Sequence, residues 1–129
     1  MYYYDLVCMT CSFLQGVSSF RFYPRYPCFS ASLVVTSVSS IGWRSTRRHA
    51  VLFKLDVCAA IAAYACGAFA FADAPMGVRL QILACMSLMS ASWALPRAGR
   101  VVHTCGHLLL SYCLLASPIP THEVDDRRA

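Results

Sequence analysis

The most hydrophobic stretch of the chain reads VLFKLDVCAAIAAYACGAFAFA (residues 51–72). Its charged side chains, Lys54 and Asp56, both lie near its start. A helix needs about 20 apolar residues to cross the hydrocarbon of a bilayer, and this run is long enough. Ala59, Ala63 and Gly67 recur at every fourth position, and such a ridge of small side chains lets a second helix approach closely. The run therefore predicts a membrane-spanning helix that packs against a neighbour.

The rest of the chain has the same apolar character. Of its 129 residues 58% are hydrophobic and 13% are charged, whereas soluble domains carry about 25% charged residues. Short loops with arginine or proline divide the chain into apolar runs, and backbone amides in hydrocarbon need partners within their own segment. We therefore expect an all-α fold, a polytopic transmembrane helical bundle that forms a single membrane domain over residues 1–129. Its five spans are predicted near 2–20, 28–43, 51–72, 78–95 and 101–119, with 28–43 the shortest, followed by a polar tail at 121–129.

The net charge of +5 is carried by residues between the apolar runs, as is common for membrane proteins. No stripe that alternates aromatic and basic residues indicates nucleic-acid binding, so we expect no nucleic-acid partner. The expected localisation is a multi-pass position in a membrane. The expected partners are membrane lipids and other membrane proteins.

The eight cysteines do not have the arrangement of a disulfide framework. Cys8 and Cys11 form a single CxxC, which is a weak signal for a metal or redox site without a second pair. The other positions mostly fall inside apolar runs, where a thiol behaves as a small hydrophobic group. These are Cys58, Cys66, Cys85, Cys105 and Cys113.

Ionisable side chains inside a predicted span are candidates for function, because exposing them to lipid is unfavourable. In a five-span topology Asp56, His103 and His107 lie near the same membrane face, where Arg44 ends its own span. His103 and His107 are four residues apart, so both rings lie on one helix face and are able to chelate one metal ion. Two alternatives stand beside this reading. The histidines are hydrated at the interface, or Asp56 forms an ion pair with Arg44 or Lys54.

These residues resemble the motifs of the CREST group of membrane hydrolases and receptors, which includes alkaline ceramidases and the progestin and adipoQ receptors. Ser40 precedes Arg44 by four residues, Asp56 lies on the next predicted helix, and His103-Thr-Cys-Gly-His107 lies on the last. The resemblance implies zinc-dependent hydrolysis of lipid amides or esters. It implies His103 and His107 as metal ligands, and Asp56 and Ser40 as catalytic residues. Arg44 stands where the group has a histidine ligand.

Two functional hypotheses follow from the sequence. In the first, the chain is a small multi-span protein without chemistry of its own, which packs against lipids or partner membrane proteins. In the second, it is a CREST-like hydrolase with Zn²⁺ as its cofactor. The first hypothesis requires no cofactor.

Overall fold

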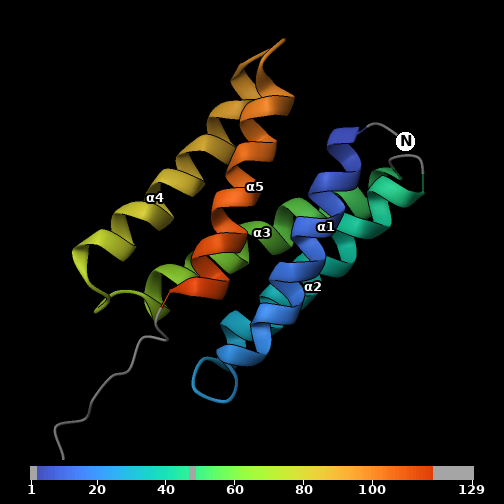
Figure 1. Cartoon of the computed structure of the whole chain (residues 1–129). Helices are drawn as coiled ribbons and strands as arrows, with labels where there is room; N and C mark the ends of the chain where they lie inside the picture. Colours follow the sequence, from blue (N-terminus) through green and yellow to red (C-terminus); the bar gives the residue numbers. More distant parts are fainter. Residues whose placement is uncertain (1–2, 47–48, 118–129) are drawn as a thin grey trace, which may run out of the picture.

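The computed structural model describes residues 3–46 and 49–117, and this part of the chain is helical throughout apart from its turns (Figure 1). The predicted all-α class with five helices is confirmed. The predicted tail at 121–129 lies outside the described residues. The α-helices are α1 (Tyr3–Ser18), α2 (Pro27–Ser45), α3 (Ala50–Ala70), α4 (Met76–Ala91) and α5 (Gly99–Ala116), with 3₁₀ turns η1 (Ser19–Arg21) and η2 (Ser92–Ala94).

The prediction that the second segment is the shortest is wrong. Helix α2 has 19 residues, whereas α1 and α4 have 16 each. It starts at Pro27, whose fixed φ suits the first turn of a helix. It continues past Trp43 to Ser45, and the Arg44 side chain turns back to Ser40, one turn earlier in the same helix. A charge at the end of the apolar run therefore did not end the helix.

Proline sets the ends of the last two helices. The predicted fourth span runs to Leu95, but α4 ends at Ala91 and η2 follows. Leu95 is extended, with ψ of 103°, because the residue before a proline avoids the helical region. Ser117 precedes the next proline and is likewise extended, with ψ of 144°, so α5 ends at Ala116.

The helices pack in an order that differs from their order in the chain. Helix α1 lies between α2 and α5, while α3 packs on α2 and α4 packs on α5. Figure 1 shows α1 beside α2 and, separately, α4 beside α5. Helix α3 has few backbone contacts with α4 or α5. The backbone of α3 therefore stands apart from α4 and α5, and side chains of these three helices face the space between them.

Small residues make the close helix contacts, as the ridge on the third segment predicted. Ala59, Ala63 and Gly67 are buried, and a Cβ added to Gly67 would lie 3.0 Å from the ring of Phe29 on α2. Glycines also make close contacts at two other helix pairs, α1–α2 and α4–α5. A Cβ on Gly16 of α1 would meet Ser37 of α2, and one on Gly106 of α5 would meet Met89 of α4.

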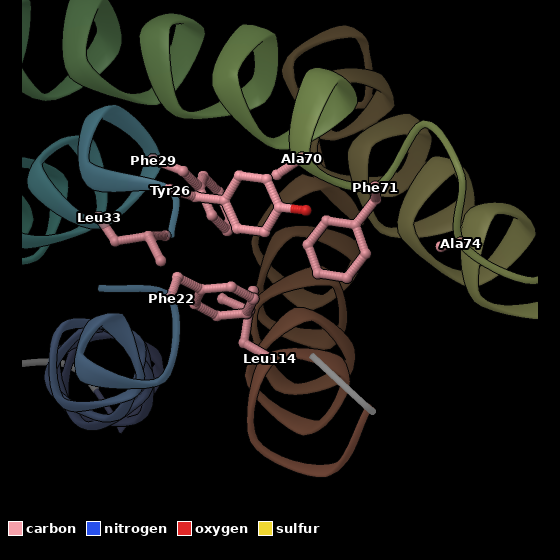
Figure 2. Close-up of a cluster of buried hydrophobic side chains, with 8 residues drawn as sticks. All are labelled: Phe22, Tyr26, Phe29, Leu33, Ala70, Phe71, Ala74 and Leu114. Carbon is pink, nitrogen blue, oxygen red and sulfur yellow. The ribbon is translucent and has the colours of Figure 1, made fainter. Parts of the chain in front are cut away.

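An aromatic cluster closes one end of the bundle, where α2 begins and where α3 and α5 end (Figure 2). The rings of Phe22, Phe29 and Phe71 meet edge to face, with centroids between 4.9 and 6.0 Å apart, a favourable geometry for aromatic pairs. This cluster fixes how α3 meets the α1–α2 pair. Its members are Phe22, Tyr26, Phe29, Leu33, Ala70, Phe71, Ala74 and Leu114.

Outside this cluster, apolar side chains are exposed on the surface and polar side chains are buried between helices. Large apolar side chains are exposed on every helix, and Phe69 of α3 (76% exposed) is an example. Many of the buried side chains are polar, including Ser12 (1% exposed) and Gln15 (4% exposed). All eight cysteines are free thiols. By length and apolar composition, one described helix, α3, is able to cross a membrane.

Candidate functional site

A cavity of about 640 Å³ lies in the space between α3 and the α4–α5 pair, and all five helices contribute to its lining. Its walls are largely apolar and include Leu33, Ile61 and Leu110. Charged and polar side chains gather towards the opposite end from the aromatic cluster, where α1, α3 and α5 begin. These are Asp5, Ser40, Arg44, Asp56, Arg100, His103 and His107.

The two histidines of α5 form a direct pair in this cavity. Their Nε2 atoms are 3.1 Å apart, and their ring centroids are 4.8 Å apart. On the far side of each ring, Nδ1 has a partner from another element. Gln15 Nε2 of α1 lies 3.2 Å from His107 Nδ1, and Ser92 Oγ of η2 lies 3.1 Å from His103 Nδ1. The pair therefore links α1, α5 and the end of α4.

One assignment of hydrogens satisfies this whole chain. The Gln15 amide nitrogen only donates, so His107 Nδ1 accepts and His107 carries its proton on Nε2. That proton is donated to His103 Nε2, so His103 carries its own proton on Nδ1 and donates it to Ser92. Ser92 Oγ in turn donates to the carbonyl of Met89 (2.6 Å). Both imidazoles are therefore neutral and are held as opposite tautomers.

Arg44 lies beside this pair and is almost fully buried, with 4% of its side chain exposed. Its Nη1 donates to Ser40 Oγ, which also accepts from Ser12 (3.0 Å). Its guanidinium carbon lies 4.4 Å from the centroid of the Trp43 ring. Among the described residues its Nε has no hydrogen-bond acceptor, and it forms an ion pair with the carboxylate of Asp5 at 3.8 Å. A buried guanidinium N–H thus remains without a hydrogen bond in the cavity lining.

Asp56 faces inward from α3, as predicted. Its carboxylate accepts from Trp43 Nε1 (2.8 Å) and from Ser39 Oγ (3.2 Å). It shares the cavity with both histidines, but in the described part of the chain no hydrogen bond joins it to either ring. Ser40 also lines the cavity, and its hydroxyl is held by Arg44 and Ser12. The structure thus brings the four predicted site residues to one cavity without joining them in a catalytic dyad.

The zinc site that the resemblance implies needs more ligands than this arrangement supplies. The 3.1 Å between the Nε2 atoms of His103 and His107 is near the spacing of two ligands on one tetrahedral ion, about 3.3 Å for Zn–N bonds of about 2.0–2.1 Å. A catalytic zinc takes three protein ligands. Over residues 3–46 and 49–117 no three His, Cys, Asp or Glu side chains converge, and Arg44 places a cation beside the pair. Among the described residues the pair therefore supplies two of the three protein ligands that a catalytic zinc ion takes.

The structure adds site residues that the sequence reasoning had passed over. Asp5 approaches Arg44, and Gln15 binds His107. Trp43 and Ser92 complete the hydrogen bonds of Asp56 and His103. The available signal was the same for Asp5 and Gln15 as for Asp56, because a polar side chain within an apolar segment turns inward to find a partner.

No family model, no curated protein and no solved structure matches the chain.

Proposed function

We propose that the chain is an integral membrane protein whose five helices all span the bilayer, and that it binds an amphipathic lipid in the cavity between α3 and the α4–α5 pair. The observation that carries the proposal is that large apolar side chains are exposed while many polar side chains are buried. Each helix exposes several large apolar side chains, while serines, a glutamine and a histidine are buried between helices. Large apolar surfaces of this kind mark contact with lipid or with a partner.

Helix length supports all five spans. The 3₁₀ turn η1 extends α1 to Arg21, and η2 extends α4 to Ala94, so every helical stretch holds at least 18 residues. A helix of 18 residues is about 27 Å long, close to the hydrocarbon thickness of about 30 Å. Trp93 and Tyr3 are exposed near helix ends, where aromatic side chains favour the membrane interface.

The shape and polarity of the cavity support a lipid as the ligand. Its volume of about 640 Å³ lies within the range of about 300–1,000 Å³ of small-molecule sites. Apolar walls suit an acyl chain, and the charged end suits a polar head group. At this charged end α1, α3 and α5 begin and α2 and α4 end. If all five helices span the bilayer, their ends lie at its surface, so the charged end lies at the depth of lipid head groups.

Labelling from one side of the membrane tests the topology. Single cysteines introduced as Thr46→Cys, Arg97→Cys and Asp73→Cys are treated with a membrane-impermeant maleimide, and peptide mapping identifies the labelled site among the native thiols. We expect Thr46→Cys and Arg97→Cys to be labelled from the same side and Asp73→Cys from the opposite side. Labelling of Thr46→Cys and Asp73→Cys from the same side contradicts the five-span arrangement.

A matched pair of substitutions on α3 tests lipid binding in the cavity. Ala60 lines the cavity, whereas Ala62 is exposed on the outside of the same helix. We expect Ala60→Phe to weaken binding of a spin-labelled phospholipid to the purified protein in detergent, because the ring projects into the site and takes up part of its volume. Ala62→Phe should bind it as the unmodified protein does. Equal binding by both variants would place the lipid elsewhere.

A further inference from the structure

We propose that the lipid in this cavity is an uncharged lipid of the diacylglycerol class, whose free hydroxyl group binds Asp56 and whose ester carbonyl binds Tyr64. The inference rests on the proposed lipid-binding function and specifies the head group. Both side chains line the cavity and retain hydrogen-bonding capacity in the described part of the chain.

The charges of the cavity lining already compensate one another. Arg44 forms an ion pair with Asp5, and its guanidinium lies over the Trp43 ring, whose N–H binds Asp56. Among the described lining residues Arg44 and Arg100 are the cations and Asp5 and Asp56 are the anions, so their formal charges cancel. Because the histidine pair is neutral, a ligand with a net charge would add an unbalanced charge to a poorly solvated site, which is unfavourable. An uncharged head group adds none.

The carboxylate of Asp56 has room for a ligand that donates a hydrogen bond. One of its oxygens accepts from Trp43 Nε1 (2.8 Å) and the other from Ser39 Oγ (3.2 Å). An ionised carboxylate has about four acceptor positions, so about two remain. A ligand hydroxyl is able to donate to one of them, and a hydrogen bond to a charged acceptor is stronger than one between neutral groups. A lipid without a hydroxyl or an amine has no group to donate there.

The hydroxyl of Tyr64 has a weak acceptor and suits a carbonyl oxygen. Its Oη donates to the thioether sulfur of Met89 at 3.4 Å, and such a sulfur is a weak acceptor. Tyr64 follows Asp56 by eight residues on α3, which places it about 12 Å further from the charged end along the helix axis. Side chains of a helix tilt towards its start, which brings the Tyr64 hydroxyl closer to Asp56. In a diacylglycerol the ester carbonyls likewise lie further from the bilayer surface than the free hydroxyl does.

The cavity also has an opening for acyl chains. Ile61 and Trp93 line it, although 62% of Ile61 and 68% of Trp93 is exposed. The cavity therefore reaches the outer surface of the helices between α3 and the end of α4. The volume of about 640 Å³ holds the glycerol group and the first part of the chains, and the remainder runs out into the bilayer.

Lipids that differ by one group test the two contacts separately. The purified full chain in detergent is titrated with dioleoylglycerol, with its acetate ester, which lacks the hydroxyl, and with the dioleyl ether, which lacks the carbonyls. Binding is followed by native mass spectrometry. We expect dioleoylglycerol to bind at least about tenfold more tightly than either analogue, equivalent to about 1.4 kcal/mol. Equal binding of the acetate ester would overturn the contact at Asp56, and equal binding of the ether would overturn the contact at Tyr64.

Phosphatidylcholine with the same acyl chains tests whether the site prefers an uncharged head group. We expect it to bind at least about tenfold more weakly than dioleoylglycerol, because the charged positions of the lining are occupied by one another. If all four lipids bind equally well, the head-group inference fails while lipid binding stands. If none of them binds, the proposed function itself fails.

Glycerol monoacetate distinguishes a lipid from a small polar ligand, because it has hydroxyls and an ester carbonyl without a long chain. We expect it to compete with dioleoylglycerol only at concentrations at least about 100-fold higher, since burial of the acyl chains supplies much of the binding free energy. Competition at equal concentration would overturn the assignment to a lipid.

A substitution at Tyr64 tests the carbonyl contact from the side of the protein. Tyr64→Phe removes the hydroxyl and keeps the ring, and Tyr112→Phe, on the exposed outside of α5, is the matched control. We expect Tyr64→Phe to weaken binding of dioleoylglycerol about fivefold and to leave binding of the ether unchanged. The control should leave both affinities unchanged. Unchanged binding of dioleoylglycerol by Tyr64→Phe would overturn this contact.

A substitution at Asp56 tests the hydroxyl contact. Asp56→Asn keeps an acceptor and removes the charge, so we expect the preference for dioleoylglycerol over its acetate ester to fall about fivefold. Asp73→Asn, in the exposed turn after α3, is the control and should keep the full preference. An unchanged preference in Asp56→Asn would overturn the contact. If this variant loses its helical circular dichroism, the comparison of dioleoylglycerol with its acetate ester on the unmodified protein decides.

Discussion

The contact between α1 and α2 at Gly16 allows a sharp test of the packing. A Cβ added at Gly16 would lie 2.5 Å from Ser37 Oγ and 2.8 Å from Ser37 Cβ. Ordinary contact begins near 3.4 Å, so the shorter distance is about 1 Å too close. The Ser37 hydroxyl is able to rotate away, but its Cβ is fixed to the backbone. Gly16→Ala therefore forces the two helices apart.

The expected magnitude combines two opposing effects. Overpacking of a well-packed contact destabilises a protein by about 1–3 kcal/mol. Replacing glycine by alanine inside a helix stabilises it by about 1 kcal/mol. Because a backbone-anchored atom must move, we expect overpacking to dominate, and the free energy of unfolding to fall by about 1–2 kcal/mol.

The measurement is reversible unfolding of the purified protein in mixed micelles, followed by far-ultraviolet circular dichroism. Gly42→Ala is the matched control, since its Cβ meets only the end of the Leu52 side chain at 3.5 Å. This control should be as stable as the unmodified protein, or up to about 1 kcal/mol more stable. Adding Ser37→Gly to Gly16→Ala removes both clashing atoms and should recover much of the lost stability. In a double-mutant cycle, the two substitutions should therefore be less destabilising together than the sum of their separate effects. Equal stability of Gly16→Ala and Gly42→Ala would refute the α1–α2 packing described here.

Three further predictions concern the polar side chains of the cavity. Nitrogen-15 NMR of labelled histidine should show His103 protonated on Nδ1 and His107 on Nε2; the same tautomer at both rings would contradict the hydrogen-bond chain. Protein purified from zinc-supplemented medium should contain well below one zinc ion per chain, because the pair has two imidazoles and an adjacent cation; stoichiometric zinc that is lost with His103→Ala would contradict this. The free energy of unfolding of Asp56→Asn should lie within about 1 kcal/mol of that of the unmodified protein, because an amide oxygen still accepts from Trp43. That of Asp56→Leu should be lower by about 1–3 kcal/mol, because the donors of Trp43 and Ser39 lose their acceptor. Similar stabilities for the two variants would show that these hydrogen bonds contribute little.

Local features of the fold follow directly from the sequence. Apolar runs of helical length gave the number of helices and most of their boundaries to within a few residues. The four-residue ridge of Ala59, Ala63 and Gly67 gave the face of α3 that packs against α2. The spacing of His103 and His107 placed both rings on one side of α5. Each of these features depends on residues that lie within one helix.

Partners between helices were harder to predict. One alternative paired Asp56 with Arg44 or Lys54, whereas in the described part of the chain the carboxylate that forms an ion pair with Arg44 is that of Asp5 on α1. Asp56 instead bonds to Trp43, and His107 bonds to Gln15. A polar residue within an apolar run predicts a side chain that turns inward. It does not predict which residue of another helix becomes its hydrogen-bond partner.

The sequence by itself determined the helices, their apolar surfaces and the polar residues that avoid them, because periodicity and solvation act over one or two turns. Only the tertiary structure decided that α1 lies between α2 and α5, and that α3 stands away from α4 and α5 to enclose a cavity. The physical reason is that helix order depends on contacts between side chains of different helices: hydrogen bonds from Gln15 to His107 and Ser111 join α1 to α5, and small residues permit close approach at the other pairs. Gly16, Gly67 and Gly106 each select a neighbour through the shape of a side chain on another helix.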